Sequence, residues 1–337
     1  MGGIGKQIKL ILITFFSIVI FCSCQKNSVL KFGIMMPDLS KMYFIDSKSH
    51  FERIITEMGG IVLSADANNN EQLQIKQATD LIEKGVSVIV ITAVNANTAA
   101  AIVRNAHEKG VKVVAYDRMI HNCNLDYYVS FNNEKVGELM ASYAIEKKPR
   151  GNYILFYGDS EDMNAHSVRK GQFRILKPYI DSGAIDVMYQ AFIDDWSGSN
   201  AFHKMNKILD YSDKIPDVLL SSYDGMSTSC IKAFENAGLD KNILVTGQNG
   251  EKEAYRNIIL GKQAMTVYKP TEELAEEVAR IAWKLAVNSE REHISTTISN
   301  SRIDVPSLLL DPILIDSKNL KNEIIDKGIF SKEELNL

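Results

Sequence analysis

Cysteine and histidine are scarce in this sequence of 337 residues, which has only 4 cysteines and 6 histidines. The cysteines form no CxxC pair and have no zinc-type spacing, and sequence alone gives no argument for a disulfide between Cys123 and Cys230. The histidines are scattered, and neither an HExxH nor a GxSxG motif occurs. His121 lies near Cys123, which fits a surface loop better than a metal site. We therefore predict no metal, no cofactor and no catalytic residues.

An excess of positive charge is also missing. The formal net charge is −4, and residues 1–23 hold two lysines and no acidic residue, so the rest of the chain is more acidic still. A mildly acidic protein has no electrostatic reason to bind nucleic acid or an anionic membrane surface. The hydrophobic share of 45% and the charged share of 24% are typical of a soluble globular protein of about two domains.

A hydrophobic run that would comfortably span a bilayer is lacking as well, because the apolar stretch at residues 10–21 is short. Lys6 and Lys9 precede this stretch. A basic start followed by a short apolar run predicts that residues 1–23 are an export signal peptide.

Ser23-Cys24 resembles the lipobox of bacterial lipoproteins, although Phe21 stands where leucine is usual. We expect Cys24 to carry the lipid and residues 24–29 to form a short tether. The protein would then be an exported, membrane-anchored lipoprotein, in the periplasm or at the outer face of the cytoplasmic membrane. A plain signal peptide that is cut nearby, or an uncleaved anchor, is the alternative.

From residue 30 onward, short apolar runs that are typical of strands alternate with amphipathic stretches that are typical of helices. The predicted strands are at residues 30–36, 61–65, 86–92, 127–131, 153–157, 185–192, 218–222, 243–246 and 265–268, with one more beginning at Val111. The predicted helices are at residues 43–58, 71–83, 97–109, 134–145, 164–179, 200–209, 227–237, 251–260 and 272–286. This alternation indicates βαβ units and parallel sheets that are covered on both faces.

The pattern falls into two similar α/β halves, and no linker rich in proline, glycine or serine separates them. We therefore expect two doubly wound parallel-sheet lobes, joined by a hinge of several short strands rather than by one flexible tether. Closure of such a hinge would bury a small solute between the lobes. The expected lobes are residues 30–132 plus 270–306, and residues 133–269 plus 307–337.

The strand that begins at Val111 ends abruptly in Asp117 and Arg118. In an open parallel sheet the ligand crevice lies outside the carboxyl ends of the strands, so this pair would face a bound molecule. An arginine offers five donors and a carboxylate offers acceptors, which together suit a small polyhydroxylated ligand. The alternative is an ion pair between the two residues that locks the turn after the strand.

Four stretches resemble the xylose-binding proteins of bacterial ABC sugar importers, a branch of the type I periplasmic-binding-protein fold. They are AYDRMI at 115–120, NEKVGE at 133–138, LKPY at 176–179 and MTVYKP at 265–270. The resemblance runs from about Lys31 nearly to the C-terminus. It implies that fold, a monomeric sugar-binding protein without catalytic activity, and an ABC permease as its partner.

The resemblance also implies a set of ligand-binding residues. A sugar has apolar C–H faces that pack on aromatic rings, and hydroxyl groups that need charged or bidentate partners. Phe44 and Trp196 match the aromatic residues, and the polar contacts match Asp117, Arg118, Asp162, Asn164 and Lys269. The alternatives are that Phe44 is a core residue of the first helix and that Lys269 is a surface lysine.

Three positions depart from the pattern of these xylose-binding proteins. Tyr43 stands where they have arginine, Tyr223 where they have asparagine, and Asn249 where they have aspartate. One charge of each sign is therefore missing, and the charges of the remaining predicted residues sum to zero. We expect a neutral monosaccharide, because an anion would find no surplus cation. The two bulky tyrosines favour a ring of aldopentose size.

Three other functions are compatible with a sugar-binding α/β fold: a glycosidase, a sugar-responsive repressor and a sugar sensor. A glycosidase could use Asp117 and Asp162, but the neighbouring Arg118 is expected to lower the carboxylate pKa and so works against a general acid. A repressor would need a helix-turn-helix where this chain has a signal peptide. The alternative that remains is a sugar sensor that presents its closed form to a membrane histidine kinase or chemoreceptor.

Overall fold

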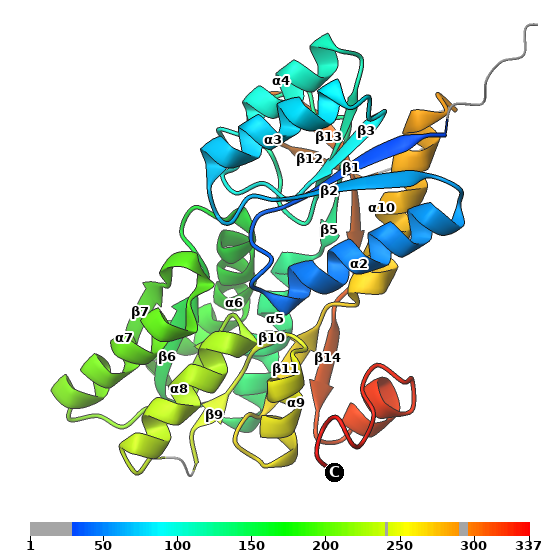
Figure 1. Cartoon of the computed structure of the whole chain (residues 1–337). Coiled ribbons are helices and arrows are strands. Elements are labelled where there is room, and N and C mark those ends of the chain that lie inside the picture. Colours follow the sequence, from blue (N-terminus) through cyan, green and yellow to red (C-terminus); the bar gives the residue numbers. More distant parts are fainter. Residues whose placement is uncertain (1–28, 240–241, 290–295) are drawn as a thin grey trace, which may run out of the picture.

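The computed structural model describes residues 29–239, 242–289 and 296–337, and arranges them as two α/β lobes (Figure 1). The predicted signal peptide and Cys24 lie outside these ranges, as does nearly all of the tether. Within the described ranges, no helix has the length and apolar character needed to cross a membrane.

The first lobe is built on a seven-stranded sheet in the order β12-β13-β5-β4-β3-β1-β2. All neighbouring strands are parallel except β12, which runs antiparallel to β13. The strands are β1 (Lys31–Met36), β2 (Ile61–Asp66), β3 (Val88–Ile91), β4 (Lys112–Tyr116), β5 (Tyr127–Phe131), β12 (Thr297–Ser299) and β13 (Asp304–Leu310). The helices of this lobe are α2 (Met42–Glu57), α3 (Glu71–Glu83), α4 (Ala100–Glu108) and α10 (Thr271–Ala286).

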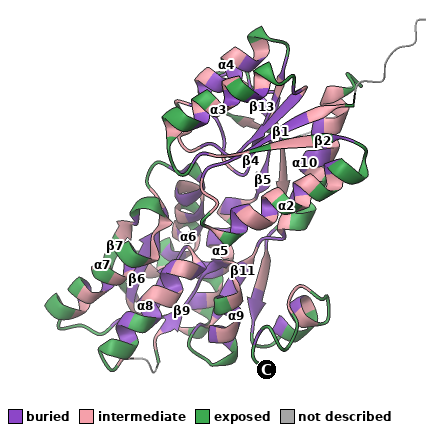
Figure 2. Ribbon diagram, in the orientation of Figure 1, coloured by how far each residue is buried: buried purple, intermediate pink, exposed green. Residues whose placement is uncertain are grey.

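The inner strands β1, β3, β4 and β5 of this sheet are buried on both faces, which explains their nearly continuous apolar sequences. In β1, Phe32 and Ile34 pack in the core that contains residues of α2 and α10, whereas Met35 packs in the core that contains residues of α3 and α4. Successive side chains of a strand point to opposite faces, so both cores are served by the same strands. Figure 2 shows these strands as largely buried between exposed helix surfaces.

The second lobe contains a four-stranded sheet, β7-β6-β8-β9, and a three-stranded sheet, β10-β11-β14. Only β14, against β11, is antiparallel among the pairs of these two sheets in the described chain. The strands are β6 (Gly151–Tyr157), β7 (Ile185–Phe192), β8 (Val218–Ser221), β9 (Leu244–Val245), β10 (Gln248–Asn249), β11 (Met265–Tyr268) and β14 (Ile313–Asp316). The helices are α5 (Asn133–Lys147), α6 (Met163–Asp181), η2 (Asp194–Trp196), α7 (Gly198–Tyr211), α8 (Asp224–Asn236), α9 (Lys252–Ile259) and η3 (Lys321–Ile325).

Within the described ranges the chain passes between the lobes after β5, after β11 and after β13, which confirms the expected multi-strand hinge. The third crossing differs from the expected position. β13 pairs with β5 through Leu310, so the chain leaves the first lobe after Leu310 rather than after residue 306. The sequence analysis did not predict β10, β12, β13 or β14. β10, β12 and β14 have only two to four residues and give little periodic signal, whereas β13 was missed although it has seven residues.

Cys123 and Cys230 lie in different lobes, and both are buried and unpaired. Burial raises the pKa of the Cys123 thiol to about 11, so it stays protonated at neutral pH. Neither cysteine has the exposed, low-pKa environment of a reactive thiol.

Helices α5 and α6 approach each other closely because glycine stands at both contact points. A methyl group at Gly137 of α5 would collide with the carbonyl oxygen of Val168, and one at Gly171 of α6 would collide with that of Glu134. These collisions are with backbone atoms, which cannot move aside as a flexible side chain would.

Gly137→Ala is therefore expected to lower the free energy of unfolding by about 1–3 kcal/mol, as overpacked sites do. Without a collision, a change from glycine to alanine inside a helix would stabilise the protein by ~1 kcal/mol. The sign of the change in the free energy of unfolding therefore distinguishes close packing at Gly137 from an uncrowded helix position. Urea unfolding of both proteins measures it. Ser142→Ala, at an exposed position of α5, serves as the control and should leave stability nearly unchanged. A more stable Gly137→Ala protein would contradict the close packing.

Candidate functional site

A cavity lies between the two lobes, with an empty volume of about 470 Å³ including the part open to solvent. All ten residues that the sequence singled out for ligand binding line this one cavity, and Lys41 and Gln248 join them. The predicted ten are Tyr43, Phe44, Asp117, Arg118, Asp162, Asn164, Trp196, Tyr223, Asn249 and Lys269.

The lining residues come together because they follow strands whose carboxyl ends face the gap between the lobes. Asp117 and Arg118 follow β4 directly, and Lys269 follows β11 directly. Asp162 lies at the N-cap of α6, where its side chain accepts a hydrogen bond from the Asn164 backbone N–H at 2.9 Å. This bond fixes the loop that brings both side chains to the cavity.

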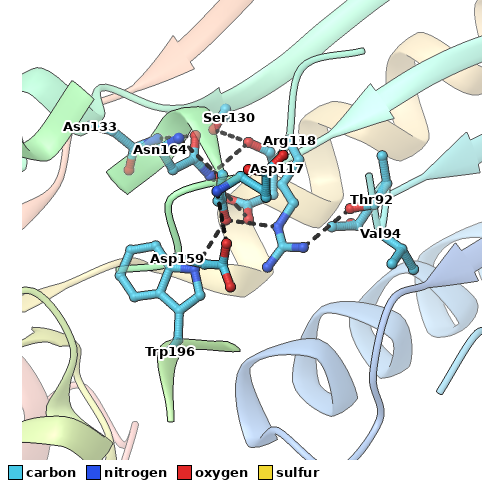
Figure 3. Close-up of polar contacts among 12 residues, drawn as sticks. Thr92, Val94, Asp117, Arg118, Ser130, Asn133, Asp159, Asn164 and Trp196 are labelled. Atoms are coloured by element: carbon cyan, nitrogen blue, oxygen red, sulfur yellow. Dashed lines mark hydrogen bonds and ion pairs between the residues drawn. The ribbon is translucent and has the colours of Figure 1, made fainter. Parts of the chain in front are cut away.

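Arg118 forms its ion pair with the opposite lobe. Its Nε lies 3.0 Å from Asp162 Oδ2, and its Nη1 donates a hydrogen bond to the Ala93 carbonyl at 3.2 Å (Figure 3). Asp117 has a left-handed backbone with φ 64°. The structure shows no ion pair between Asp117 and Arg118, so the alternative in which the two only lock a turn is wrong.

Asp117 is almost completely buried, and its polar atoms contact both lobes. Its Oδ1 accepts a hydrogen bond from the Tyr43 hydroxyl at 3.1 Å, and its carbonyl accepts one from Asn164 Nδ2 at 3.1 Å. Burial raises the pKa of Asp117, whereas the charges of Lys269 and Arg118 lower it by less. Arg118 lowers this pKa as expected, but the net direction is upward, because desolvation of the carboxylate is the larger effect.

Lys269 is a buried cation with an exposed fraction of only 4%, so the surface-lysine alternative is wrong. Its Nζ donates a hydrogen bond to Asn133 Oδ1 at 2.7 Å, and Asn133 Nδ2 donates in turn to Asn164 Oδ1 at 2.9 Å. Burial lowers the pKa of Lys269, while the carboxylates of Asp117 and Asp162 raise it. Lys269 and Asn133 lie at two of the chain crossings, so this polar chain connects the hinge to the cavity.

Trp196 is held by a specific set of contacts. Its indole Nε1 donates to Asp162 Oδ2 at 3.2 Å, and its ring lies against Gly158, where any side chain would collide with it. Asp195 and Trp196 both have positive φ angles, 58° and 52°, which turn the indole toward the cavity. Such φ angles are rare outside glycine and persist only where the surroundings stabilise them.

Phe44 has two roles, because it lines the cavity and also packs in the core that contains residues of α2 and α10. The core alternative is therefore correct for part of its surface. The Arg118 guanidinium carbon lies 5.6 Å from the centre of the Phe44 ring, within reach of a cation–π interaction.

The two tyrosines at the departing positions direct their hydroxyl groups at carboxylates. Tyr43 donates to Asp117, and Tyr223 donates to Glu251 Oε1 at 2.7 Å. The Tyr223 ring also packs edge-on against Trp196, with centroids 6.4 Å apart and an interplanar angle of 88°. Both tyrosines therefore fill part of the cavity wall with aromatic surface.

The sequence reasoning missed Lys41, Gln248, Asn133 and Asp224. Lys41 precedes α2 and follows β1, and Gln248 is next to Asn249, so the rule of strand carboxyl ends could have found both. With Lys41 the lining holds three cations and two carboxylates, and not the balanced set that was expected. Within the described residues, no cluster of histidine, cysteine or acidic side chains is suited to a metal ion.

A family model described as a periplasmic binding protein domain matches residues 32–290 of the chain. This protein belongs to the periplasmic binding protein family. The D-xylose-binding periplasmic proteins of Escherichia coli and Haemophilus influenzae are each 36% identical to it, over 98% and 95% of this chain and 100% and 96% of their own. An ABC transporter solute binding protein from Clostridium phytofermentans, solved with bound β-D-glucose, has a TM-score of 0.84 and 29% identity over 90% of this chain and 99% of its own.

These relatives confirm the resemblance that the four sequence stretches indicated, and with it the fold class. They cover both lobes, so this periplasmic binding protein has the whole architecture of its relatives. The cavity therefore lies between two lobes that match those of periplasmic binding proteins.

Asp224 lies behind the cavity lining of this periplasmic binding protein, where it holds the segment that follows Asn249. Its completely buried carboxylate accepts hydrogen bonds from the backbone N–H groups of Gly250 and Glu251, and from Gln263 Nε2 and Thr266 Oγ1, at 2.8–3.0 Å. Burial and, to a smaller extent, the Glu251 carboxylate raise the pKa of Asp224 to about 7, although the hydrogen bonds act in the opposite direction.

A raised pKa means that the folded protein holds the Asp224 proton more tightly than the unfolded chain does. This contribution to stability is complete below about pH 4 and is lost as the pH rises to about 7. We expect the free energy of unfolding of the wild type, relative to Asp224→Asn, to fall by up to ~1.4 kcal/mol per pH unit between pH 5 and pH 6.5. Urea unfolding of both proteins from pH 5 to pH 8 measures this. A difference that stays constant or grows with pH would contradict it.

Proposed function

We propose that this protein is an extracytoplasmic solute-binding lipoprotein, not an enzyme, that captures a neutral monosaccharide between its lobes and delivers it to an ABC importer. The observation that carries the proposal is the cavity itself. Arg118 from one lobe and Asp162 from the other meet there beside two aromatic rings, Phe44 and Trp196. Charged donors and acceptors suit the hydroxyl groups of a sugar, and aromatic rings suit its C–H faces.

The charge around the cavity supports a neutral ligand. The carboxylates of Asp117 and Asp162 balance Arg118 and Lys269, and Lys41 lies close to Asp38 and Asp195, which offset its charge. A buried anion would therefore lose its hydration without gaining an unbalanced cation.

An aldopentose is the favoured ligand. The aromatic rings of Tyr43 and Tyr223 occupy part of the wall, which leaves less room for the hydroxymethyl group of a hexose. The names of the two 36% identical relatives, which bind D-xylose, support the same choice. Because the Clostridium phytofermentans protein holds β-D-glucose, hexoses belong in the test.

Arg118→Ala should leave the fold intact, because Arg118 follows a strand and is not part of an apolar core. It should weaken sugar binding by about 2–5 kcal/mol, because Asp162 and the ligand would be left desolvated without their partner. Calorimetry or Trp196 fluorescence with xylose, arabinose, ribose, glucose and galactose measures the affinity. Analysis of the sugars after incubation should show them unchanged.

Arg150→Ala, at an exposed position between α5 and β6, is the matched control and should bind like the wild type. Wild-type affinity in Arg118→Ala would remove Arg118 from the site. Any sugar product, or tight binding of sugar phosphates alone, would overturn the proposed function.

Cys24 is expected to carry the lipid, because Ser23-Cys24 follows a short apolar run and precedes a polar tether. Two acyl chains give stable membrane anchoring, where a single chain gives only marginal binding. Fatty-acid labelling should mark the wild type and Cys22→Ala but not Cys24→Ala, and only the labelled proteins should partition into detergent. Labelling of Cys24→Ala would place the anchor elsewhere.

A further inference from the structure

Two polar side chains enter the cavity from opposite lobes without a role in the site described so far. Lys41 comes from the loop between β1 and α2, and Gln248 from β10. Each stands next to a position at which this chain departs from the xylose-binding pattern, since Lys41 is two residues before Tyr43 and Gln248 is one before Asn249.

Gln248 holds an acceptor that has no partner. Its side chain is 3% exposed, and its Oε1 is fully buried without a hydrogen bond in the described structure. Leaving such an oxygen unsatisfied is unfavourable, so a buried unpaired acceptor in a native protein calls for an explanation. Among the described side chains with unpartnered buried atoms, only Gln248 and Arg118 line the cavity, and Arg118 already pairs with Asp162. A ligand hydroxyl is the donor that the Gln248 oxygen lacks.

Lys41 holds donors at the mouth of the cavity. It lines both the cavity and the polar hollow that adjoins it, so a ligand atom near the opening passes close to it. Its Nζ donates one hydrogen bond to the Asp195 carbonyl of the opposite lobe at 2.7 Å. An ammonium group has three N–H donors, so this bond does not exhaust its capacity.

The contact between Lys41 and Asp195 exists only while the lobes are together. Asn69 Nδ2 also reaches Asp195, donating to its Oδ1 at 2.9 Å. Asp195 precedes Trp196, so these contacts from the first lobe lie beside the indole that lines the cavity. Lys41 is therefore placed to act on a ligand in the closed arrangement.

We propose that Gln248 and Lys41 are specificity-determining residues of the cavity, with Gln248 Oε1 accepting a hydrogen bond from one ligand hydroxyl and Lys41 donating to an oxygen near the mouth. The inference rests on the proposed function and names two residues that choose among sugars. Gln248 offers a neutral acceptor and Lys41 a charged donor beside positions where the xylose-binding proteins carry charged residues, so the preferred sugar is set by which hydroxyl groups reach these two side chains.

The test uses Gln248→Met and Lys41→Met, because methionine is similar in length to both residues and offers neither a strong acceptor nor a charged donor. Calorimetry with the panel sugar that binds the wild type most tightly should give about tenfold to hundredfold weaker binding for Gln248→Met and about tenfold weaker for Lys41→Met. Gln72→Met and Lys76→Met, at exposed positions of α3, are matched controls and should bind like the wild type.

Monodeoxy analogues of the same sugar separate a direct contact from a structural effect. In the wild type, one analogue should bind about tenfold more weakly than the parent sugar. In Gln248→Met, the same analogue and the parent sugar should bind with equal affinity, because the hydroxyl that the analogue lacks is the one from which Gln248 accepts a hydrogen bond. Circular dichroism checks that each variant is folded. The loss of affinity for one analogue is measured on the wild type, so it tests the contact even if a variant does not fold.

The outcomes of the proposed function and of this inference differ. If the wild type binds a panel sugar and both variants bind it equally well, the inference is overturned and the proposed function stands. If every monodeoxy analogue loses affinity equally in the wild type and in Gln248→Met, the contact from Gln248 is overturned. If the wild type binds none of the five sugars, the proposed function fails and the inference fails with it.

Discussion

The ion pair between Arg118 and Asp162 is the interaction on which the arrangement of the cavity depends. It joins the two lobes at 3.0 Å, and both side chains are largely shielded from water. Separating a buried pair without providing new partners leaves two desolvated charges, which strongly destabilises the separated state unless water or a ligand replaces the lost partner. An opening of the lobes would therefore break this pair and would require water to solvate both charges.

The hinge has a polar connection to the same cavity. Lys269 and Asn133 lie at two different crossings of the chain, and hydrogen bonds lead from them through Asn164 to the Asp117 carbonyl. These residues are buried, and buried polar groups stay fixed when every partner is present. These hydrogen bonds therefore connect two chain segments of the hinge to residues that line the cavity.

The departures from the xylose-binding pattern have a common geometry. Tyr43 and Tyr223 turn their hydroxyl groups toward Asp117 and Glu251, so each tyrosine presents ring surface to the cavity and satisfies its polar atom behind it. Two neighbouring positions bring further polar groups to the cavity, the unpartnered oxygen of Gln248 and the ammonium group of Lys41, to which we assign the choice among sugars.

Local patterns in the sequence were enough for the two α/β lobes and for the strand-end pair Asp117 and Arg118, because strand alternation, helical periodicity and strand-end residues depend on neighbours in the chain. The other eight predicted residues of the cavity followed from the resemblance to the xylose-binding proteins. Local patterns were not enough for β10, β12, β13 and β14, whose strand pairing depends on partners from other parts of the chain. Nor did the sequence indicate that the Asp117 pKa is raised overall, since the burial that raises it comes from distant segments. Only the tertiary structure decided that Arg118 pairs across the lobes, that Lys269 is buried, and that Lys41 and Gln248 reach the cavity, because each of these depends on contacts between residues far apart in the chain.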